Sequence, residues 1–289
     1  MNKSKLGFII SMLLSGSIGI FVREIPFSSA QVAWVRGFIG GIFILACNLI
    51  FTKKISFDKI LKNLHILIPA GIALGFNWML LFEAYKYTTI ATATICYYFA
   101  PVLIMFVSPI LLKERLNIVK VICILVSMLG IIMVSGIGKG GSFTGVIYGL
   151  SAAVVYASIV ILNKKLKDIS GMESGFVQLF VSAVVMGIYI FFTDSFSFPA
   201  LSTKELIVLL VVGIVHTGIL YLLYFSCVQA LPSQVSAVFS YIDPVSAIIF
   251  SAIFLRENMK SLQLVGGLLV LGATFANEMY ASKKEILPK

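Results

Sequence analysis

Two acidic residues lie inside long apolar stretches of the sequence and are the first candidates for chemistry. Glu83 and Asp243 are both preceded and followed by mainly aliphatic and aromatic residues. A carboxylate is costly at membrane depth, and acids found there commonly bind ions or substrates or carry protons. We therefore take both acids as candidate ligands of a cationic group or a coupling proton. The alternative is a structural acid that accepts hydrogen bonds from nearby serines or from another helix.

The residues before Asp243 favour a binding role for this acid. Ser233, Ser236 and Ser240 precede it at intervals of three and four residues, so a continuous helix would place all four on one face. Asp243 also directly precedes Pro244, which lacks an N–H and would leave the Ser240 carbonyl without its helical partner. An acid beside a free carbonyl on a serine-lined face predicts a site that is filled with water or binds a cation.

Glu83 has two candidate charge partners. Lys86 follows it by three residues, a spacing that permits an ion pair on one helix. Arg36 lies in another apolar stretch and is the other candidate, because a buried charge needs a partner. Arg36 is thus expected to act as a charge partner, in a structural role or at the binding site.

Aromatic and hydroxyl side chains accompany the two acids and predict a cavity with aromatic walls. Aromatic faces near a carboxylate would suit an organic cation or the ammonium end of a zwitterion. The candidate lining residues, beside the two acids, are Asn77, Trp78, Thr94, Tyr97, Tyr98, Thr217, Tyr221, Tyr224, Ser240 and Tyr241. The alternative for each tyrosine is that it packs or lies in an interfacial belt.

The composition indicates which elements must position these residues. Hydrophobic residues make up 60% of the chain and charged residues 12%, against about 45–50% and about 25% in soluble domains. This excludes an ordinary soluble globule. Because about 20 apolar residues span a bilayer as a helix, the apolar stretches predict an all-α integral membrane protein with ten transmembrane helices. They cover about 6–22, 31–51, 65–85, 89–112, 117–136, 144–162, 173–192, 204–226, 234–255 and 262–280.

The charges set an orientation and exclude several function classes. With the N terminus inside, the inner segments hold fifteen Lys and Arg and the outer segments hold six, which predicts cytoplasmic N and C termini. The net charge of +10 does not indicate nucleic-acid binding, because the basic residues lie between the apolar segments and do not cluster in one region of the sequence. The four cysteines lie in apolar runs, and no Gly-rich phosphate loop occurs. We therefore expect no cofactor, metal or ATP-driven step.

The two halves of the chain are similar at a constant offset of 143 residues. Matching residues include Tyr98 with Tyr241, Pro101 with Pro244, and Glu114 with Glu257. Five spans in each half mean that the second half enters the membrane from the opposite side. The sequence therefore predicts two inverted-topology five-helix repeats, 1–138 and 139–289. Pro101 and Pro244 are expected to bend equivalent helices near the centre and to serve as gating positions.

Several motifs, taken together, resemble those of a known family. They are FEAYKYTT at 82–89, YYFAP at 97–101, LKER at 112–115, YIDP at 241–244 and LRE at 255–257. Their order and spacing resemble the EamA family of the drug/metabolite transporter superfamily over almost the whole chain. The resemblance implies a carrier of small metabolites in the plasma or inner membrane, often an exporter, with ten spans and both termini inside. The resemblance also favours a role for Arg36 that is shared across the family, because an arginine at this point of the second span is common there.

The leading hypothesis is a secondary active transporter that alternates access around a midplane site and exports amino-acid-like solutes. It is not expected to be an enzyme. Its expected partners are the lipid bilayer and a small-molecule substrate, with a coupling proton or cation and a second copy of the chain as open options. The alternatives are an uptake carrier for an amphipathic organic cation, an intramembrane enzyme acting on lipids, and a noncatalytic membrane interaction protein.

Overall fold

A computed structural model of the chain describes residues 3–52, 56–111, 118–135, 143–193, 197–228, 230–231 and 233–286. These residues form helices and connecting turns, and none of them lies in a strand. The first half contains α1 (Lys3–Arg23), α2 (Ser29–Cys47), the π-helix η1 (Asn48–Thr52), α3 (Phe57–Tyr87), α4 (Ile90–Tyr97), α5 (Ala100–Leu111) and α6 (Ile118–Ser135). The second half contains α7 (Phe143–Asn163), α8 (Gly171–Thr193), α9 (Thr203–Gly213), the π-helix η2 (Ile214–Ile219), α10 (Leu220–Val228), α11 (Ser233–Ser240), α12 (Ile242–Phe254) and α13 (Ser261–Ile286).

The helices have the length and apolar character of membrane spans. Seven helical segments of the described chain meet both criteria: Lys3–Arg23, Ser29–Ile50, Phe57–Tyr87, Ile90–Val107, Phe143–Asn163, Gly171–Thr193 and Thr203–Val228. Three shorter apolar helices cover Ile118–Val134, Val238–Phe254 and Ser261–Asn277. Large apolar side chains such as Phe106 and Phe192 are exposed on the outer faces of the bundle, which suits a hydrocarbon surrounding. The predicted all-helical class is thus confirmed.

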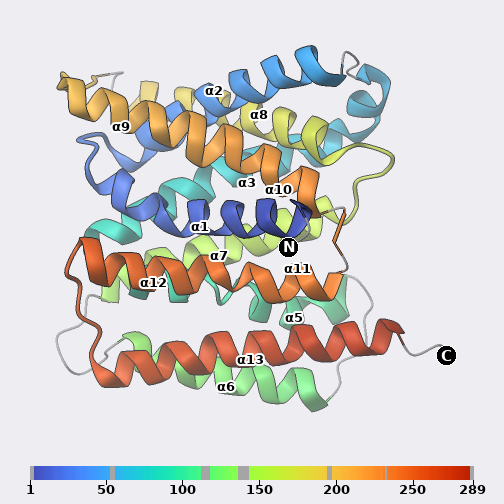
Figure 1. The fold of residues 1–289 in the computed structure, drawn as a ribbon, viewed down its shortest axis with the longest axis vertical. Helices are drawn as coiled ribbons and strands as arrows, with labels where there is room; N and C mark the ends of the chain where they lie inside the picture. The colour runs from blue at the N-terminus through green and yellow to red at the C-terminus, as the bar shows by residue number, and fades with distance from the viewer. Residues whose placement is uncertain are drawn as a thin grey trace.

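Helix α1 lies in the middle of the bundle and connects its two sides. The helices run roughly side by side in Figure 1, with α2 and α8 at one edge and the pair α6 and α13 at the other. Between these edges, α1 packs against α9 and α10 on one side and against α11 and α12 on the other. Side chains of α1 can therefore contact residues of the second half of the chain on both sides of the helix.

Helix α3 begins earlier than the sequence indicates. Its first residue is Phe57, whereas the apolar stretch predicts a start near 65. The backbone N–H groups of Lys59 and Ile60 both donate to the Ser56 carbonyl, and Asp58 lies in the first turn, where a negative charge is favourable. Hydropathy locates the apolar part of a helix and misses a polar extension. Lys59 and Lys62, which the sequence places in a loop, therefore lie on α3.

The helices that carry the two repeat-related prolines are interrupted rather than bent. The first break is at Tyr98, with ψ 5°, between α4 and α5, and the second is at Tyr241, with ψ −8°, between α11 and α12. Pro101 and Pro244 lie in the first turn of the helix that follows each break. A first-turn proline loses no helical hydrogen bond, because its missing N–H would have no partner there. Each proline therefore starts a new helix segment.

Candidate functional site

Asp243 is held at the centre of the bundle by side chains from two other segments. Its Oδ2 accepts a hydrogen bond from Ser15 Oγ of α1 at 2.7 Å and one from Tyr98 Oη, at the end of α4, at 2.8 Å. The carboxylate is only partly buried. Within the described part of the chain, its Oδ1 accepts no hydrogen bond and no Lys or Arg forms an ion pair with it. One oxygen is therefore fixed and the other is available to a ligand.

The predicted serine stripe does not surround Asp243. Ser240 Oγ donates to the carbonyl of Ser236 at 2.8 Å and so bonds to its own helix. The side chain of Ser233 lies outside the described residues. The break at Tyr241 separates α11 from α12, so the three-and-four spacing of a continuous helix no longer applies across it. The shared serine face therefore stays a prediction.

Arg36, on α2, is buried with a relative exposure of 7%. Its Nε donates to Thr217 Oγ1 at 2.8 Å and its Nη2 donates to the His216 carbonyl at 3.2 Å. Its guanidinium carbon lies 3.9 Å from the centre of the Trp78 ring. This cation–π contact stabilises the positive charge of Arg36. Its Nη1 makes no hydrogen bond to any described residue. Of the described acids, Asp243 is close enough for its charge to act on Arg36, although the two form no ion pair.

A π-helical segment shapes the surface that Arg36 contacts. In η2, Thr217 Oγ1 donates to the carbonyl of Val212 at 3.0 Å, five residues earlier, and His216 Nδ1 lies 3.4 Å from the carbonyl of Val211. His216 Nε2 also lies 2.9 Å from Ser17 Oγ of α1. In this π turn the backbone N–H of Leu220, four residues after His216, donates to the carbonyls of Val215 and Thr217, and the His216 carbonyl accepts from Arg36. Short π-helical segments occur frequently at functional sites.

These contacts form two hydrogen-bonded groups, one around Asp243 and one around Arg36, which share helix α1 through Ser15 and Ser17. We call the two groups together the central polar cluster. Its members are Ser15, Ser17, Arg36, Tyr98, His216, Thr217 and Asp243. It holds one acid and one arginine, each with atoms left unbonded by the described chain. Ser15 and Ser17 were not predicted, and their only signal in the sequence is a pair of hydroxyls in an apolar span.

Several of the predicted cavity residues lie beside this cluster. Tyr97 Oη donates to Asn77 Oδ1 at 3.5 Å, and the rings of Tyr97 and Tyr98 are 6.0 Å apart. Asn77 also donates to the carbonyl of Ala152 at 2.8 Å. Because Trp78 stacks on Arg36, residues of α3 and α4 form an aromatic and amide wall next to the two charged groups.

Other predicted cavity residues have contacts elsewhere. Tyr224 packs against Phe8, with ring centres 5.7 Å apart, in a separate apolar group. Tyr241 makes an edge contact with Phe275 of α13 at 5.3 Å. Thr94 is buried within α4. The helical period predicts which residues share a face of one helix, but neighbouring helices determine what that face meets.

Glu83 lies apart from Asp243, near the C-terminal end of α3. Of its two predicted partners, it pairs with Lys86, whose Nζ is 3.0 Å from Oε2, and not with Arg36. Ser29 Oγ donates to the same oxygen at 2.6 Å. Ser29 and Lys86 line a cavity of about 380 Å³ between α1, α2 and α3. Glu83 therefore lies beside this cavity and bonds to two of the residues that line it.

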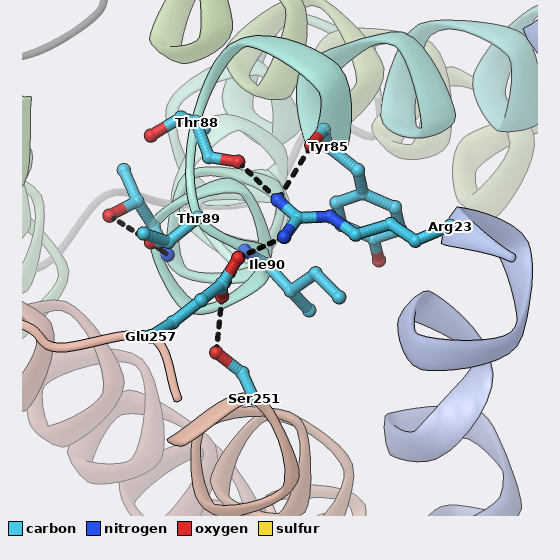
Figure 2. Close-up of polar contacts among 8 residues, drawn as sticks. Arg23, Tyr85, Thr88, Thr89, Ile90, Ser251 and Glu257 are labelled. Carbon is cyan, nitrogen blue, oxygen red and sulfur yellow. Dashed lines mark hydrogen bonds and ion pairs between the residues drawn. The ribbon is translucent and has the colours of Figure 1, made fainter. Parts of the chain in front are cut away.

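A second polar group, which we call the outer junction, joins four helices around Arg23 and Glu257 (Figure 2). Arg23 forms an ion pair with Glu257 and also donates to the carbonyls of Tyr85 and Thr88, at 2.7 and 2.8 Å. Glu257 accepts from the backbone N–H of Ile90 at 2.9 Å. The arginine thus satisfies the C-terminal end of α3, and the glutamate satisfies the N-terminal end of α4. Both charges have the sign that complements a helix dipole.

A further bond to Glu257 makes the outer junction a testable source of stability. The Ser251 hydroxyl also donates to Glu257, whose side chain is only 10% exposed. We expect Glu257→Ala to lower the free energy of unfolding by about 2–4 kcal/mol, because it removes the carboxylate that neutralises the Arg23 guanidinium and leaves the buried N–H of Ile90 without its acceptor. Thermal or denaturant unfolding in detergent measures this.

The control is the exposed ion pair between Glu24 and Lys204, which lie 2.6 Å apart at the same end of the bundle. Their side chains are 44% and 76% exposed. Glu24→Ala should change stability by less than about 1 kcal/mol. Equal losses in the two variants would show that the outer junction contributes no more than a surface ion pair.

The fold and the central polar cluster define a class, a helical multi-pass membrane protein with charged groups held between its spans. The model of the EamA-like transporter family matches residues 3–136 and again residues 143–277. The chain therefore belongs to the EamA-like transporter family and is a membrane transporter.

Similar proteins carry transporter names. The chain is 30% identical over 267 residues to "Uncharacterized transporter YxxF" of Bacillus subtilis (strain 168), which covers 89% of this chain and 84% of that protein. It is 24% identical over 266 residues to an "Uncharacterized transporter" of Clostridium kluyveri, covering 88% and 84%. A solved crystal structure has the same fold, with a TM-score of 0.66 at 15% identity, over 97% of this chain and 99% of that one.

Proposed function

We propose that the protein is a secondary active carrier that exports amino-acid-like metabolites across the cell membrane. Both termini would be cytoplasmic, and the substrate would bind at the central polar cluster. The observation that carries this proposal is that the central polar cluster holds two oppositely charged groups, and that Asp243 Oδ1 and Arg36 Nη1 are left unbonded by the described chain. A zwitterion presents the complementary ammonium and carboxylate groups.

Alternating access would follow from ten spans arranged as two inverted repeats. The interruptions at Tyr98 and Tyr241 are 143 residues apart, the same offset that relates the two halves of the sequence. The family model also matches the chain twice. Broken helices at equivalent positions of two repeats are typical of carriers with a central site. Asp243 would also be the residue that binds a coupling proton or cation.

Proteoliposomes test the proposed function. Vesicles are loaded with unlabelled amino acids, and each radiolabelled amino acid is added outside in turn. We expect saturable counterflow of at least one of them, absent from protein-free vesicles. Radiolabelled tetraethylammonium is assayed in the same way. Exchange of tetraethylammonium alone would overturn the amino-acid proposal and support the organic-cation carrier.

The structure offers a reason to prefer the zwitterion over the organic cation. An aromatic cage requires free ring faces, whereas a face of Trp78 is already covered by Arg36 at 3.9 Å. A bound organic cation would also meet the positive charge of that arginine. The alternative of an intramembrane enzyme predicts that a lipid product forms without translocation of any solute. Detecting such a product would support the enzyme over the carrier.

A further inference from the structure

A second cavity, of about 640 Å³, opens between the first turns of α3 and the connection from α7 to α8. We call it the basic pocket, because its lining includes Lys59, Lys62, His65, Lys165 and Lys167 with one acid, Asp168. None of the four lysines forms an ion pair within the described residues. In Figure 1 the α7–α8 connection lies at the end of the bundle where α1 begins. The pocket is therefore remote from the outer junction.

A buried amide fixes the two walls of the basic pocket to each other. Asn63 is 4% exposed, and its Nδ2 donates to the carbonyls of Lys59 and Lys167 at 2.8 and 2.9 Å. Its Oδ1 accepts from the backbone N–H of Lys167 at 3.1 Å. Leu166 and Ile169 of the connection pack on an apolar group that includes residues of α3. The lysines therefore project from a backbone that is held in place.

One side of the basic pocket adjoins an apolar face of α3. Phe57, Leu61, Ile68 and Ile72 are exposed and share one helical face, with Phe57 69% exposed and Leu61 63%. His65, which lines the pocket, lies four residues after Leu61 and three before Ile68, one helical turn from each. Exposed apolar side chains of a membrane helix face acyl chains. Basic side chains thus meet a lipid-facing surface at this edge.

We propose that the basic pocket binds the phosphate of an anionic phospholipid, whose acyl chains lie along the Phe57, Leu61, Ile68 and Ile72 face. Unpaired lysines attract a phosphate, and basic pockets at the ends of membrane helices suit anionic headgroups. Four lysines outweigh the repulsion from the single carboxylate of Asp168. A free phosphate shares this chemistry, but it would leave the adjoining apolar face unused. The proposal does not depend on the substrate or direction of transport.

Native mass spectrometry of the delipidated full-length chain in an uncharged detergent tests the proposal. Phosphatidylglycerol, phosphatidylcholine and inorganic phosphate are titrated separately. We expect phosphatidylglycerol to bind and to raise the melting temperature, with phosphatidylcholine bound much more weakly. Lys62→Gln/Lys167→Gln should weaken phosphatidylglycerol binding about thirtyfold, since each lysine beside an anionic headgroup contributes about fivefold in affinity. The control is Lys3→Gln/Lys5→Gln, which removes the same charge from the first turns of α1 and should leave binding unchanged.

Three outcomes would overturn the proposal. If the pocket and control variants lose equal affinity, the attraction is to overall charge and not to the pocket. If phosphatidylglycerol and phosphatidylcholine bind equally, the headgroup is not recognised. If inorganic phosphate binds the wild type more tightly than phosphatidylglycerol does and is lost in the pocket variant, the ligand is a soluble phosphate compound. Melting temperatures measured without lipid show whether each variant is folded.

Discussion

We expect Asp243→Asn to reduce amino-acid counterflow at least about tenfold, the largest effect of any single substitution in the central polar cluster. Asparagine has nearly the same size and can still accept hydrogen bonds from Ser15 and Tyr98, whose hydroxyls now bond Oδ2. It lacks the negative charge that would bind an ammonium group or a proton. A charge-assisted hydrogen bond contributes about 1.5–3 kcal/mol, which corresponds to about tenfold to hundredfold in affinity.

Two further variants distinguish the effect of the Asp243 charge on transport from the effect of neighbouring hydrogen bonds. Tyr98→Phe removes one hydroxyl that positions the carboxylate and should reduce counterflow severalfold, because a neutral hydrogen bond contributes about 1 kcal/mol. Ser240→Ala is the matched control, since among the described residues the Ser240 hydroxyl bonds only to the Ser236 carbonyl of its own helix. It should transport as the wild type does. Wild-type counterflow in a folded Asp243→Asn protein would exclude this acid from the transport site.

We expect Gly16→Ala to destabilise the protein by about 1–3 kcal/mol, the range found for overpacked interiors. A Cβ at Gly16 would lie 2.5 Å from the Asp243 carbonyl oxygen and 2.9 Å from the Ala247 nitrogen. Both are backbone atoms, so α1 and α12 must separate. Because Ser15 on α1 bonds the Asp243 carboxylate, this separation should also lower counterflow.

Gly272→Ala is the control for this substitution. Gly272 lies in α13, and a Cβ there would meet nothing within 4 Å. Both substitutions replace glycine by alanine within a helix, which by itself favours the helix by about 1 kcal/mol. Gly272→Ala should therefore be neutral or slightly stabilising, whereas Gly16→Ala is not. Thermal unfolding in detergent compares them, and a Gly16→Ala protein as stable as Gly272→Ala would disprove the close approach of α1 and α12.

The architecture could be predicted from the sequence because hydrophobicity is a local property. A run of apolar residues must form its backbone hydrogen bonds within itself, so it becomes a helix whatever its neighbours are. For the same reason Asp243 and Arg36 stood out, since each is a charge in such a run. The start of α3 was predicted too late because Asp58, Lys59 and Lys62 are polar but still helical.

The contacts between helices could not be predicted in the same way, since they depend on how each helix is rotated about its axis. The bond between Ser15 and Asp243 joins residues 228 positions apart and requires α1 and α12 to touch at Gly16. The π-helical turn at His216 likewise leaves no signature in hydropathy. Glu257 was recognised as a repeat position, but its bonds to Arg23 and Ile90 follow only from the packed bundle.

The outer junction has a consequence for how much work a conformational change would need. Glu257 follows α12, whereas Arg23 and Ile90 belong to the first half of the chain. Any movement that separates these elements at this end must exchange several charged contacts for water at once. The outer junction would then stabilise the state in which this end is closed, and the free energy of its contacts would set the ratio of closed to open molecules. A carrier with a weakened outer junction would spend more of its cycle open on that side.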